Sequence, residues 1–296
     1  FPAKPLRLVV PFAAGGVADQ IGRLVAERLQ QSLGQPVLVV NRDGAGTILG
    51  AEMVAKSPPD GYTLFLGNDA LTINAGSGRK LPYDTLRDLA PVTLVYQGRQ
   101  VLVVSHALGV TSVEELLARA RVAPGWLTYG SSGSGSSIHL ASASFETVAG
   151  VKLVHVPFKG VAPAMTEVIA GRVDVLFANS GFAAPYIRTG KVKALAMAAE
   201  RRSAQFPELA TLRELGIDFT AGSWYGLLVP GETPKEVVAK LNEAAVAILR
   251  SPEMQQKMVV MGGEALALRP AEFGALIREE IRRWGEVVRA NAVKLD

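Results

Sequence analysis

The chain contains no cysteine, and this absence removes several kinds of chemistry at once. Without a thiol there is no disulfide, no thiolate nucleophile and no cysteine-ligated zinc site. Histidine is also scarce, because the sequence holds only His106, His139 and His155. No two of these have the spacing of a helical metal-binding pair. We therefore expect neither a metal site nor a cofactor.

Long apolar runs and concentrated charge are missing as well. No run approaches the roughly 20 residues that span a bilayer, so we expect no membrane span. The net charge is a modest +4, and the densest basic clusters are Arg201 with Arg202 and Arg282 with Arg283. A nucleic-acid-binding protein is expected to carry a basic stripe, and we find none. The mild positive charge agrees, weakly, with an anionic small-molecule ligand.

What is present is the composition of a well-packed globular protein. Of the 296 residues, 49% are hydrophobic and 20% are charged, and a chain of this length favours two domains. The sequence begins Phe-Pro-Ala-Lys-Pro, which is typical of a mature protein whose signal peptide has been cleaved. A chain shortened for other reasons would begin in the same way. We expect an exported protein.

Strands alternate with helices along the sequence, which predicts an α/β fold with mostly parallel sheets. Apolar residues from Ile21 to Leu33 recur at helical spacing, and Gly34 favours the end of that helix. Ser112 with Glu115 has the spacing of a capping box. Short apolar runs predict strands at residues 6–12, 36–40, 62–66, 101–104, 127–129, 153–158, 173–177, 191–198 and 224–229. Further helices are expected before residue 56, near residues 161–171 and 182–189, and in three segments ending at residue 292.

The last strand and the helices after it have no sheet of their own, so they must dock onto another part of the chain. The economical solution is a return to the first domain. We therefore expect domain 1 from residues 1–99 plus 223–296 and domain 2 from residues 100–222, with a ligand cleft between them. Two crossovers, near residues 97–100 and 220–223, would then form a hinge on which two lobes open and close.

Two loops rich in small residues follow predicted strands, at residues 12–18 and 130–137. Ligands of open α/β sheets bind at the carboxyl ends of the strands. Glycine lets bare backbone approach a ligand, a helix N-terminus offers free N–H donors, and serine adds hydroxyl donors in the second loop. Together the loops suit a ligand with two acidic groups, or with one acidic and one neutral polar end. The alternative is that both are ordinary strand–helix turns.

Known catalytic and nucleotide-binding motifs are absent from these loops. The second loop is close to a phosphate-binding loop, but Ser136 stands where lysine is required. The spacing Gly-x-Ser-x-Gly of a nucleophile elbow does not occur in it. In the first loop, Gly15 and Gly16 make no dinucleotide fingerprint, and Asn41 occupies the place of its acidic residue. We therefore predict a binding protein that is not an enzyme and has no catalytic residues.

Further polar side chains lie near expected strand ends. Asn68 and Asp69 follow the third strand. A carboxylate repels an anion, so Asp69 is expected to face a ligand hydroxyl or amino group, or to cap a helix. His139 follows the second loop, either as a ligand contact or as a structural hydrogen-bond partner. Lys159, after another strand, either adds positive charge to the cleft or lies in solvent.

Many short motifs occur in order along nearly the whole chain. They include Pro11-Phe12 with Gly15-Gly16 and Asp19, Asn41-Arg42 before Gly44-Ala45-Gly46, Pro59-Asp60-Gly61-Tyr62, Asp88-Leu89-Ala90-Pro91-Val92, Tyr129-Gly130-Ser131, His155-Val156-Pro157-Phe158-Lys159-Gly160, Gly171-Arg172-Val173-Asp174 and Trp224-Tyr225-Gly226. With these motifs the chain, from Pro5 to about Ile281, resembles the Bug-type extracytoplasmic solute receptors, which are the binding components of tripartite tricarboxylate transporters.

This resemblance implies a type II periplasmic-binding-protein fold, with two α/β domains joined by two crossover strands that close like a Venus flytrap. It also implies a periplasmic protein that passes a carboxylate to membrane permease subunits, and we expect it to be a monomer. The family's loop contacts, carried onto this sequence together with the polar residues above, give the predicted ligand-binding set. Its members are Phe12, Ala13, Gly16, Val17, Ala18, Asn68, Asp69, Ser131, Ser132, Gly135, Ser136, Ser137, His139, Ala178 and Asn179.

Two departures from the family pattern bear on the ligand. The family often has proline where this chain has Ala14, which loosens the first loop. It often has an acidic residue where this chain has Ala178, and such a residue would pair with a ligand ammonium group. We therefore expect a mono- or dicarboxylate without an amino group. Two alternatives stay open, namely delivery of the bound form to a sensor kinase and a hydrolase of similar fold.

Overall fold

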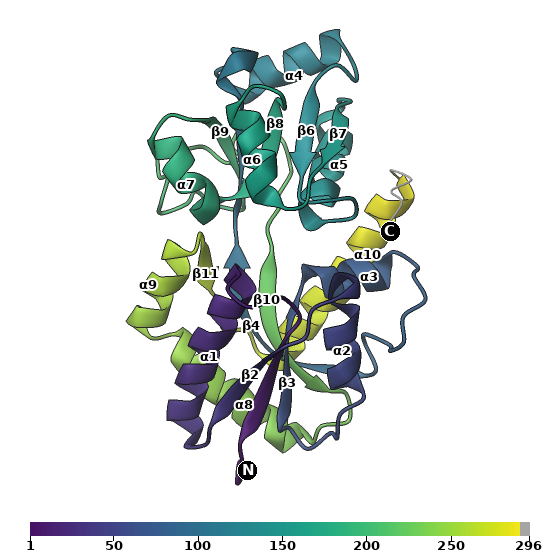
Figure 1. Cartoon of the computed structure of the whole chain (residues 1–296), viewed down its shortest axis with the longest axis vertical. Coiled ribbons are helices and arrows are strands. Elements are labelled where there is room, and N and C mark those ends of the chain that lie inside the picture. The colour runs from purple at the N-terminus through teal and green to yellow at the C-terminus, as the bar shows by residue number, and fades with distance from the viewer. Residues whose placement is uncertain (291–296) are drawn as a thin grey trace. The chain divides into compact units, whose positions relative to one another are not determined.

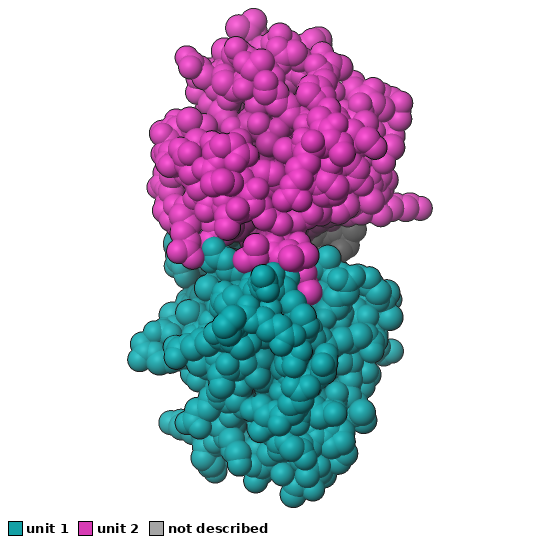
Figure 2. Space-filling model, turned by 90° about the vertical axis from the view of Figure 1, so that its left-hand side faces the viewer, with its two compact units in different colours: residues 1–97, 224–258, 264–286 teal, residues 98–223, 259–263, 287–296 magenta. Residues whose placement is uncertain are grey.

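The computed structural model describes residues 1–290, and the chain divides into two compact units (Figures 1 and 2). Unit 1 comprises Phe1–Gln97, Trp224–Met258 and Glu264–Glu286, and unit 2 comprises Gly98–Ser223, Val259–Gly263 and the described residues from Val287. Each unit is built on its own sheet, with helices interleaved between its strands. The α/β class predicted from the sequence is confirmed.

The sheet of unit 1 has six strands in the order β11-β4-β10-β3-β1-β2. Its strands are β1 (Leu6–Val10), β2 (Val37–Asn41), β3 (Thr63–Asn68), β4 (Leu89–Gly98), β10 (Trp224–Pro230) and β11 (Gly263–Ala265). β1 pairs in parallel with β2 and β3, but β10 is antiparallel to β3 and β4. The expectation of a mostly parallel sheet is therefore wrong. β10 begins at the edge where β3 and β4 end, so it must run against both.

Six α-helices of the described chain belong to this unit, and all except the one after β3 were predicted (Figure 1). They are α1 (Val17–Leu33), α2 (Ile48–Ala55), α3 (Asp69–Gly76), α8 (Lys235–Leu249), α9 (Pro252–Val260) and α10 (Pro270–Ala290), with a 3-10 helix at Ala45–Thr47. α1 buries Ile21, Leu24 and Leu29 on the expected face, and it ends at Gly34, which has a left-handed conformation. Among the described helices, none is both long enough and apolar enough for a membrane span.

The sheet of unit 2 has five strands in the order β7-β6-β8-β5-β9. Its elements are β5 (Gln100–Val104), a 3-10 helix (His106–Leu108), α4 (Val113–Val122), β6 (Thr128–Ser131), α5 (Ser137–Ala149), β7 (Val154–Pro157), α6 (Val161–Ile169), β8 (Val175–Asn179), α7 (Ser180–Arg188) and β9 (Lys193–Ala198). β6 is parallel to β7 and β8, whereas β5 is antiparallel to β8 and β9. The core contains the ring of Phe177, whose centroid lies 5.3 Å from that of Phe145 and 5.6 Å from that of Phe219.

Local sequence patterns predicted some of the helix caps and strands but not all of them. The N-cap predicted at Ser112 is confirmed, because its Oγ accepts the Glu115 N–H at 3.1 Å. The Glu115 carboxylate, however, accepts from the N–H of Thr111 at 2.6 Å and not from that of Ser112. Strands β4 and β11 were not predicted. β4 contains Pro91, which argues against a strand from the sequence, and the structure places it opposite Leu228, beside a shift in the β4–β10 register.

The short segment Val259–Gly263 and the described residues from Val287 lie in unit 2, whereas all residues after 222 were expected in domain 1. The segment Val259–Gly263 packs against the start of α7. Glycines make this packing possible. A Cβ on Gly181 would come within 2.6 Å of the Gly262 backbone. The two segments can therefore approach this closely only because neither has a side chain at the contact. The Ser180 hydroxyl donates to the Gly262 carbonyl at 3.1 Å, which ties the segment to the start of α7.

Candidate functional site

The first predicted loop joins β1 to α1 in unit 1, and two polar side chains hold it. Asn41, the last residue of β2, donates through Nδ2 to the Phe12 carbonyl at 3.0 Å and to Asp19 Oδ1 at 2.9 Å. Asp19, in the first turn of α1, accepts the Gly15 N–H through Oδ2 at 2.9 Å and pairs with Arg23 Nε at 2.9 Å. The backbone is thus fixed near the start and near the end of the loop.

The negative charge of Asp19 interacts with groups of the protein itself. Its side chain is buried, and hydrogen bonding to Arg23 lowers the pKa of Asp19 to about 2, with smaller effects from Gly15 and Asn41 opposing the cost of burial. The carboxylate therefore stays ionised at neutral pH. A negative charge in the first turn also interacts favourably with the helix dipole. In the sequence Asp19 was noted only as part of a family motif, and its contacts show that it anchors the loop.

The N–H groups at the start of α1 have no partner within the helix. Val17 and Ala18 are its first two residues. Glycine is not required at position 16. Gly16 has an ordinary φ of −78°, and a Cβ there would lie 4.0 Å from its nearest neighbour, the Ala13 carbonyl. Gly15, with φ of +92°, is the position that requires glycine.

Asn68 and Asp69 lie at the end of β3, the strand beside β1. Both are buried, and Asn68 Nδ2 donates to Asp69 Oδ1 at 2.8 Å. Asp69 is the first residue of α3, where the dipole favours its charge. Tyr225, which the sequence analysis did not select, pairs with Asn68 across the sheet, and its ring centroid lies 6.4 Å from that of Phe12. Burial and the nearby Asp69 raise the pKa of Tyr225, so its hydroxyl stays protonated.

The second predicted loop joins β6 to α5 in unit 2. Ser131 is the last residue of β6, and Ser136 is the N-cap of α5, with its Oγ accepting the His139 N–H at 3.3 Å. Ser131 is fully buried, whereas Ser132 and Ser137 are partly exposed. Ser137 is also the first helical residue, so its N–H has no partner within α5. Of the predicted serines, Ser132 and Ser137 are therefore best placed to present donors.

Two imidazole rings anchor this second loop. His139 Nδ1 accepts the Gly135 N–H at 3.0 Å, and His155 Nε2 lies 2.6 Å from the Ser131 hydroxyl. The two rings stack with their centroids 3.8 Å apart and their planes at 6°, and the Tyr129 ring lies 5.0 Å from that of His155. The structure thus gives His139 the structural hydrogen bond considered for it from the sequence.

Both imidazoles are neutral at pH 7. Burial, together with the neighbouring His155, lowers the pKa of His139 to about 4. Burial also lowers the pKa of His155. Sequence reasoning did not select His155, because it lies in a different strand 24 residues from Ser131. Its place in the strand predicted at residues 153–158 was the signal that could have found it.

The remaining predicted residues lie at the end of β8, the strand parallel to β6. Asn179 caps α7, because its Oδ1 accepts from the N–H groups of Gly181 at 3.0 Å and Phe182 at 3.2 Å. Ala178 is fully buried in the sheet. Gln100 pairs with Asn179 across the sheet, and its side-chain oxygen is buried without a hydrogen-bond partner among the described residues. It is a further polar group at this edge that the sequence analysis did not select.

The predicted set thus falls into two groups, one in each unit. Unit 1 holds Phe12, Ala13, Gly16, Val17, Ala18, Asn68 and Asp69, and unit 2 holds Ser131, Ser132, Gly135, Ser136, Ser137, His139, Ala178 and Asn179. Within each group the residues come from neighbouring parallel strand ends. One site made from both groups stays a prediction. Within residues 1–290 there is no cluster of three or more side chains suited to a metal ion.

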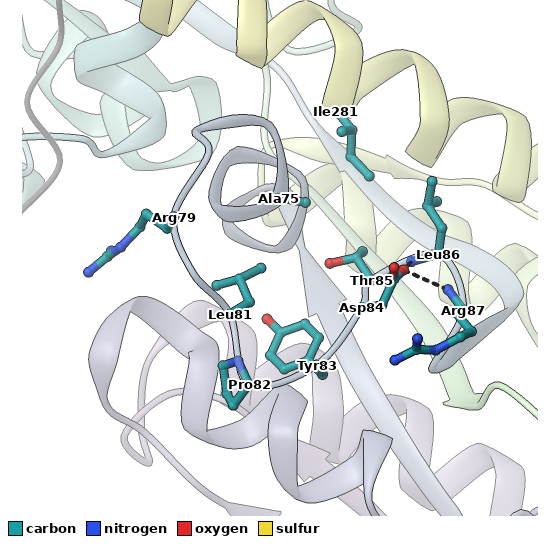
Figure 3. A pocket seen from close by; sticks show the side chains of 10 residues that line it. All are labelled: Ala75, Arg79, Leu81, Pro82, Tyr83, Asp84, Thr85, Leu86, Arg87 and Ile281. Atoms are coloured by element: carbon teal, nitrogen blue, oxygen red, sulfur yellow. Dashed lines mark hydrogen bonds between the residues drawn. The ribbon is translucent and has the colours of Figure 1, made fainter.

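Unit 1 also contains a pocket of about 510 Å³ that includes none of the predicted residues (Figure 3). It is lined by Ala75, Arg79, Leu81, Pro82, Tyr83, Asp84, Thr85, Leu86, Arg87 and Ile281. Asp84 accepts the Arg87 N–H at 2.9 Å, and the Arg87 guanidinium pairs with Asp88 at 2.7 Å. Because these charges are satisfied within the protein, we assign no ligand to this pocket.

Comparison with known proteins gives a consistent result over nearly the whole chain. Residues 21–293 match the model of the tripartite tricarboxylate transporter family receptor. Protein BugT of Bordetella pertussis is 34% identical over 298 residues, which cover 100% of this chain and 91% of that protein.

Solved structures agree with this match. A Rhodopseudomonas palustris protein determined with adipate is 34% identical, with a TM-score of 0.85 and coverage of 99% of both chains. MatC of the same species, determined with bound malate, is 33% identical, with a TM-score of 0.80 and coverage of 97% of this chain and 100% of that one. The periplasmic-binding-protein fold expected from the resemblance is confirmed.

Replacement of Asp19 tests the anchoring of the first loop. We expect Asp19→Ala to lower the free energy of unfolding by about 1–3 kcal/mol, because Asn41 and Gly15 lose a charged acceptor. Asp43→Ala, in the exposed loop after β2, is the matched control and should change stability little. Urea denaturation measures both. Equal effects of the two substitutions would contradict the anchoring role.

The lowered pKa of His139 predicts an acid-sensitive fold. Below pH 6.5 the unfolded chain binds a proton at this histidine, while the folded protein does not until about pH 4. The free energy of unfolding should therefore fall as the pH drops through this window. His139→Asn should flatten the decline, and His106→Gln, at an exposed histidine, should leave it unchanged. A pH series of urea denaturations with the same slope for all three proteins would refute this assignment.

Proposed function

The chain belongs to the tripartite tricarboxylate transporter family of receptors, and we propose that this periplasmic solute-binding receptor captures a small organic carboxylate that lacks an amino group. The observation that carries the proposal is the matching design of the two loops. In each unit, a glycine-containing loop leads from a parallel strand into a helix whose first N–H groups have no helical partner. Such a helix start is an anion site.

The composition of the loops supports recognition through backbone and hydroxyl donors. Residues 12–18 and 130–137 contain no lysine or arginine. We propose that the two oxygens of one ligand carboxylate accept hydrogen bonds from the N–H groups of Val17 and Ala18. The other end of the ligand would meet Ser132 and Ser137, which offer both N–H and hydroxyl donors.

The chemical class of the proposed ligand follows from this arrangement of the two loops. Two related structures were determined with malate and with adipate, both of which are dicarboxylates. Two donor loops suit a molecule of that class, although a monocarboxylate with a neutral polar end would also satisfy them. A ligand ammonium group would need an anionic partner, and Ala178 offers none where relatives of this type often carry an acidic residue. The carboxylate of Asp69 already accepts a hydrogen bond from Asn68 and lies in the first turn of α3, so we assign it a role within unit 1. We therefore place amino acids outside the ligand class.

Capture is proposed to proceed by closure of two lobes around the ligand. We propose that units 1 and 2 are the two lobes, with the ligand between them. A ligand that contacts both lobes binds the closed form more tightly than the open form, and only this difference can drive closure. The closed receptor would then deliver its ligand to membrane permease subunits, without performing catalysis.

A ligand screen by thermal unfolding tests the proposed function directly. The panel contains malate, succinate, adipate, benzoate, citrate, aspartate and glutamate. A ligand at 100 times its Kd should stabilise the protein by about 2.7 kcal/mol, and we expect this with at least one non-amino carboxylate. Tight binding of aspartate or glutamate would overturn the ligand class. No shift with any acid, for protein that native mass spectrometry finds free of bound molecules, would overturn the function.

A substitution at Gly16 separates ligand binding from folding. Because a side chain at this position projects into open space, Gly16→Leu should fold normally while covering the N–H groups of Val17 and Ala18. We expect the affinity for the best carboxylate of the screen to fall about tenfold or more, which corresponds to one lost charged hydrogen bond. Ala275→Leu, on an exposed position of α10, is the control. Unchanged affinity in Gly16→Leu, measured by calorimetry, would exclude the first loop as the site.

A further inference from the structure

In unit 2 the stacked imidazoles of His139 and His155 each make a hydrogen bond to the second loop, which packing in the core alone would not require. We propose that His139 and His155 are positioning residues for ligand binding, which hold opposite ends of the second loop through one ring nitrogen each and do not themselves contact the ligand. This inference rests on the proposed function, because it concerns the same loop.

His139 holds the end of the loop that leads into α5. The Gly135 N–H points at Nδ1 at a distance of 3.0 Å, so Nδ1 must carry a lone pair and the ring proton must lie on Nε2. Gly135 has φ of +74°, which turns its N–H in a direction that other residues rarely adopt. A hydrogen-bond acceptor at the position of Nδ1 is therefore what keeps this turn in place.

His155 holds the start of the loop. Its Nε2 lies 2.6 Å from Ser131 Oγ, and Ser131 is fully buried. The same hydroxyl oxygen accepts the Gly133 N–H at 3.1 Å. One serine side chain thus connects β7, which carries His155, to the second residue after β6. The hydroxyl also lies 3.1 Å from the Gly133 carbonyl. Without the imidazole nitrogen, Ser131 would therefore be bonded to Gly133 alone, and the side-chain link from this end of the loop to β7 would be lost.

The two anchors support each other because their rings are stacked. His139 belongs to α5 and His155 to β7, yet their planes are nearly parallel at 6° and 3.8 Å apart. Tyr129 is the partner of His155 in the β6–β7 register and lies on the same face, with ring centroids 5.0 Å apart. Strands β6 and β7 and helix α5 are thereby joined through three rings.

This arrangement separates two groups of polar atoms in the loop. The Gly135 N–H and the Ser131 hydroxyl are occupied within the protein. Ser132 and Ser137 remain partly exposed. The histidines thus determine where the ligand donors lie, so their loss should weaken binding without removing a ligand contact.

A crossed set of amide substitutions tests this role. The side-chain oxygen of asparagine can occupy the position of a histidine Nδ1, whereas the end of glutamine reaches the position of Nε2. We therefore expect His139→Asn and His155→Gln to bind near wild-type affinity. His139→Gln and His155→Asn should bind about tenfold more weakly, because each lacks a partner at the right atom. Calorimetric titration with malate and adipate measures all four.

The outcomes separate this inference from the proposed function. His106→Gln, at an exposed histidine of unit 2 whose Nε2 lies 2.9 Å from the Gly190 carbonyl, is the control and should bind normally. If wild-type protein binds no carboxylate of the ligand screen, the proposed function fails. If it binds one and the four variants show no crossed pattern, the positioning role fails while the function stands.

A second measurement covers the case in which a variant does not fold. Nitrogen NMR of the histidine rings in the wild-type protein reports which ring nitrogen carries the proton. We expect His139 to be unprotonated at Nδ1 at pH 7, both free and with malate or adipate, whichever binds. A proton on Nδ1 would overturn the inference, since the bond from Gly135 could not then exist.

Discussion

Hydrogen bonds between neighbouring side chains and the two loops are the interaction on which the proposed site depends. Asn41 and Asp19 hold the loop between β1 and α1, and His139 and His155 hold the loop between β6 and α5. A loop rich in glycine and serine has many accessible conformations, and ordering it costs conformational entropy. These four side chains order the loops during folding. In the proposed site, the donors at the helix starts are therefore already in position before a ligand binds.

The two units hold their loops with side chains of different chemistry. Unit 1 uses a carboxylate that stays ionised, because Arg23 pairs with Asp19. Unit 2 uses two neutral rings, whose burial disfavours protonation. In the proposed complex the anion meets only fixed backbone and hydroxyl donors, and little further ordering is needed on binding. Specificity among carboxylates would then depend on ligand length and shape more than on the number of charges.

The sequence was sufficient for the α/β class, most strands, the face and end of α1, and the two loops, because each depends on local spacing or on glycine. It was not sufficient for β4, whose Pro91 argues against a strand until its place beside a register shift is known. It also missed Tyr225 and His155. Both residues reach their loops only through strand pairing, with Asn68 in one case and Tyr129 in the other. Contacts made by pairing between distant strands leave no local pattern in a sequence.

The most direct test of the account is amide NMR of the uniformly labelled protein during titration with a carboxylate that stabilises it. The account predicts that the N–H resonances of Val17, Ala18, Ser132 and Ser137 shift most, and that those of Gly15 and Gly135 keep the signature of their internal hydrogen bonds. Shifts confined to other parts of the chain, such as the pocket that contains Arg79 and Tyr83, would contradict the claim that pre-positioned backbone donors of the two loops bind the ligand.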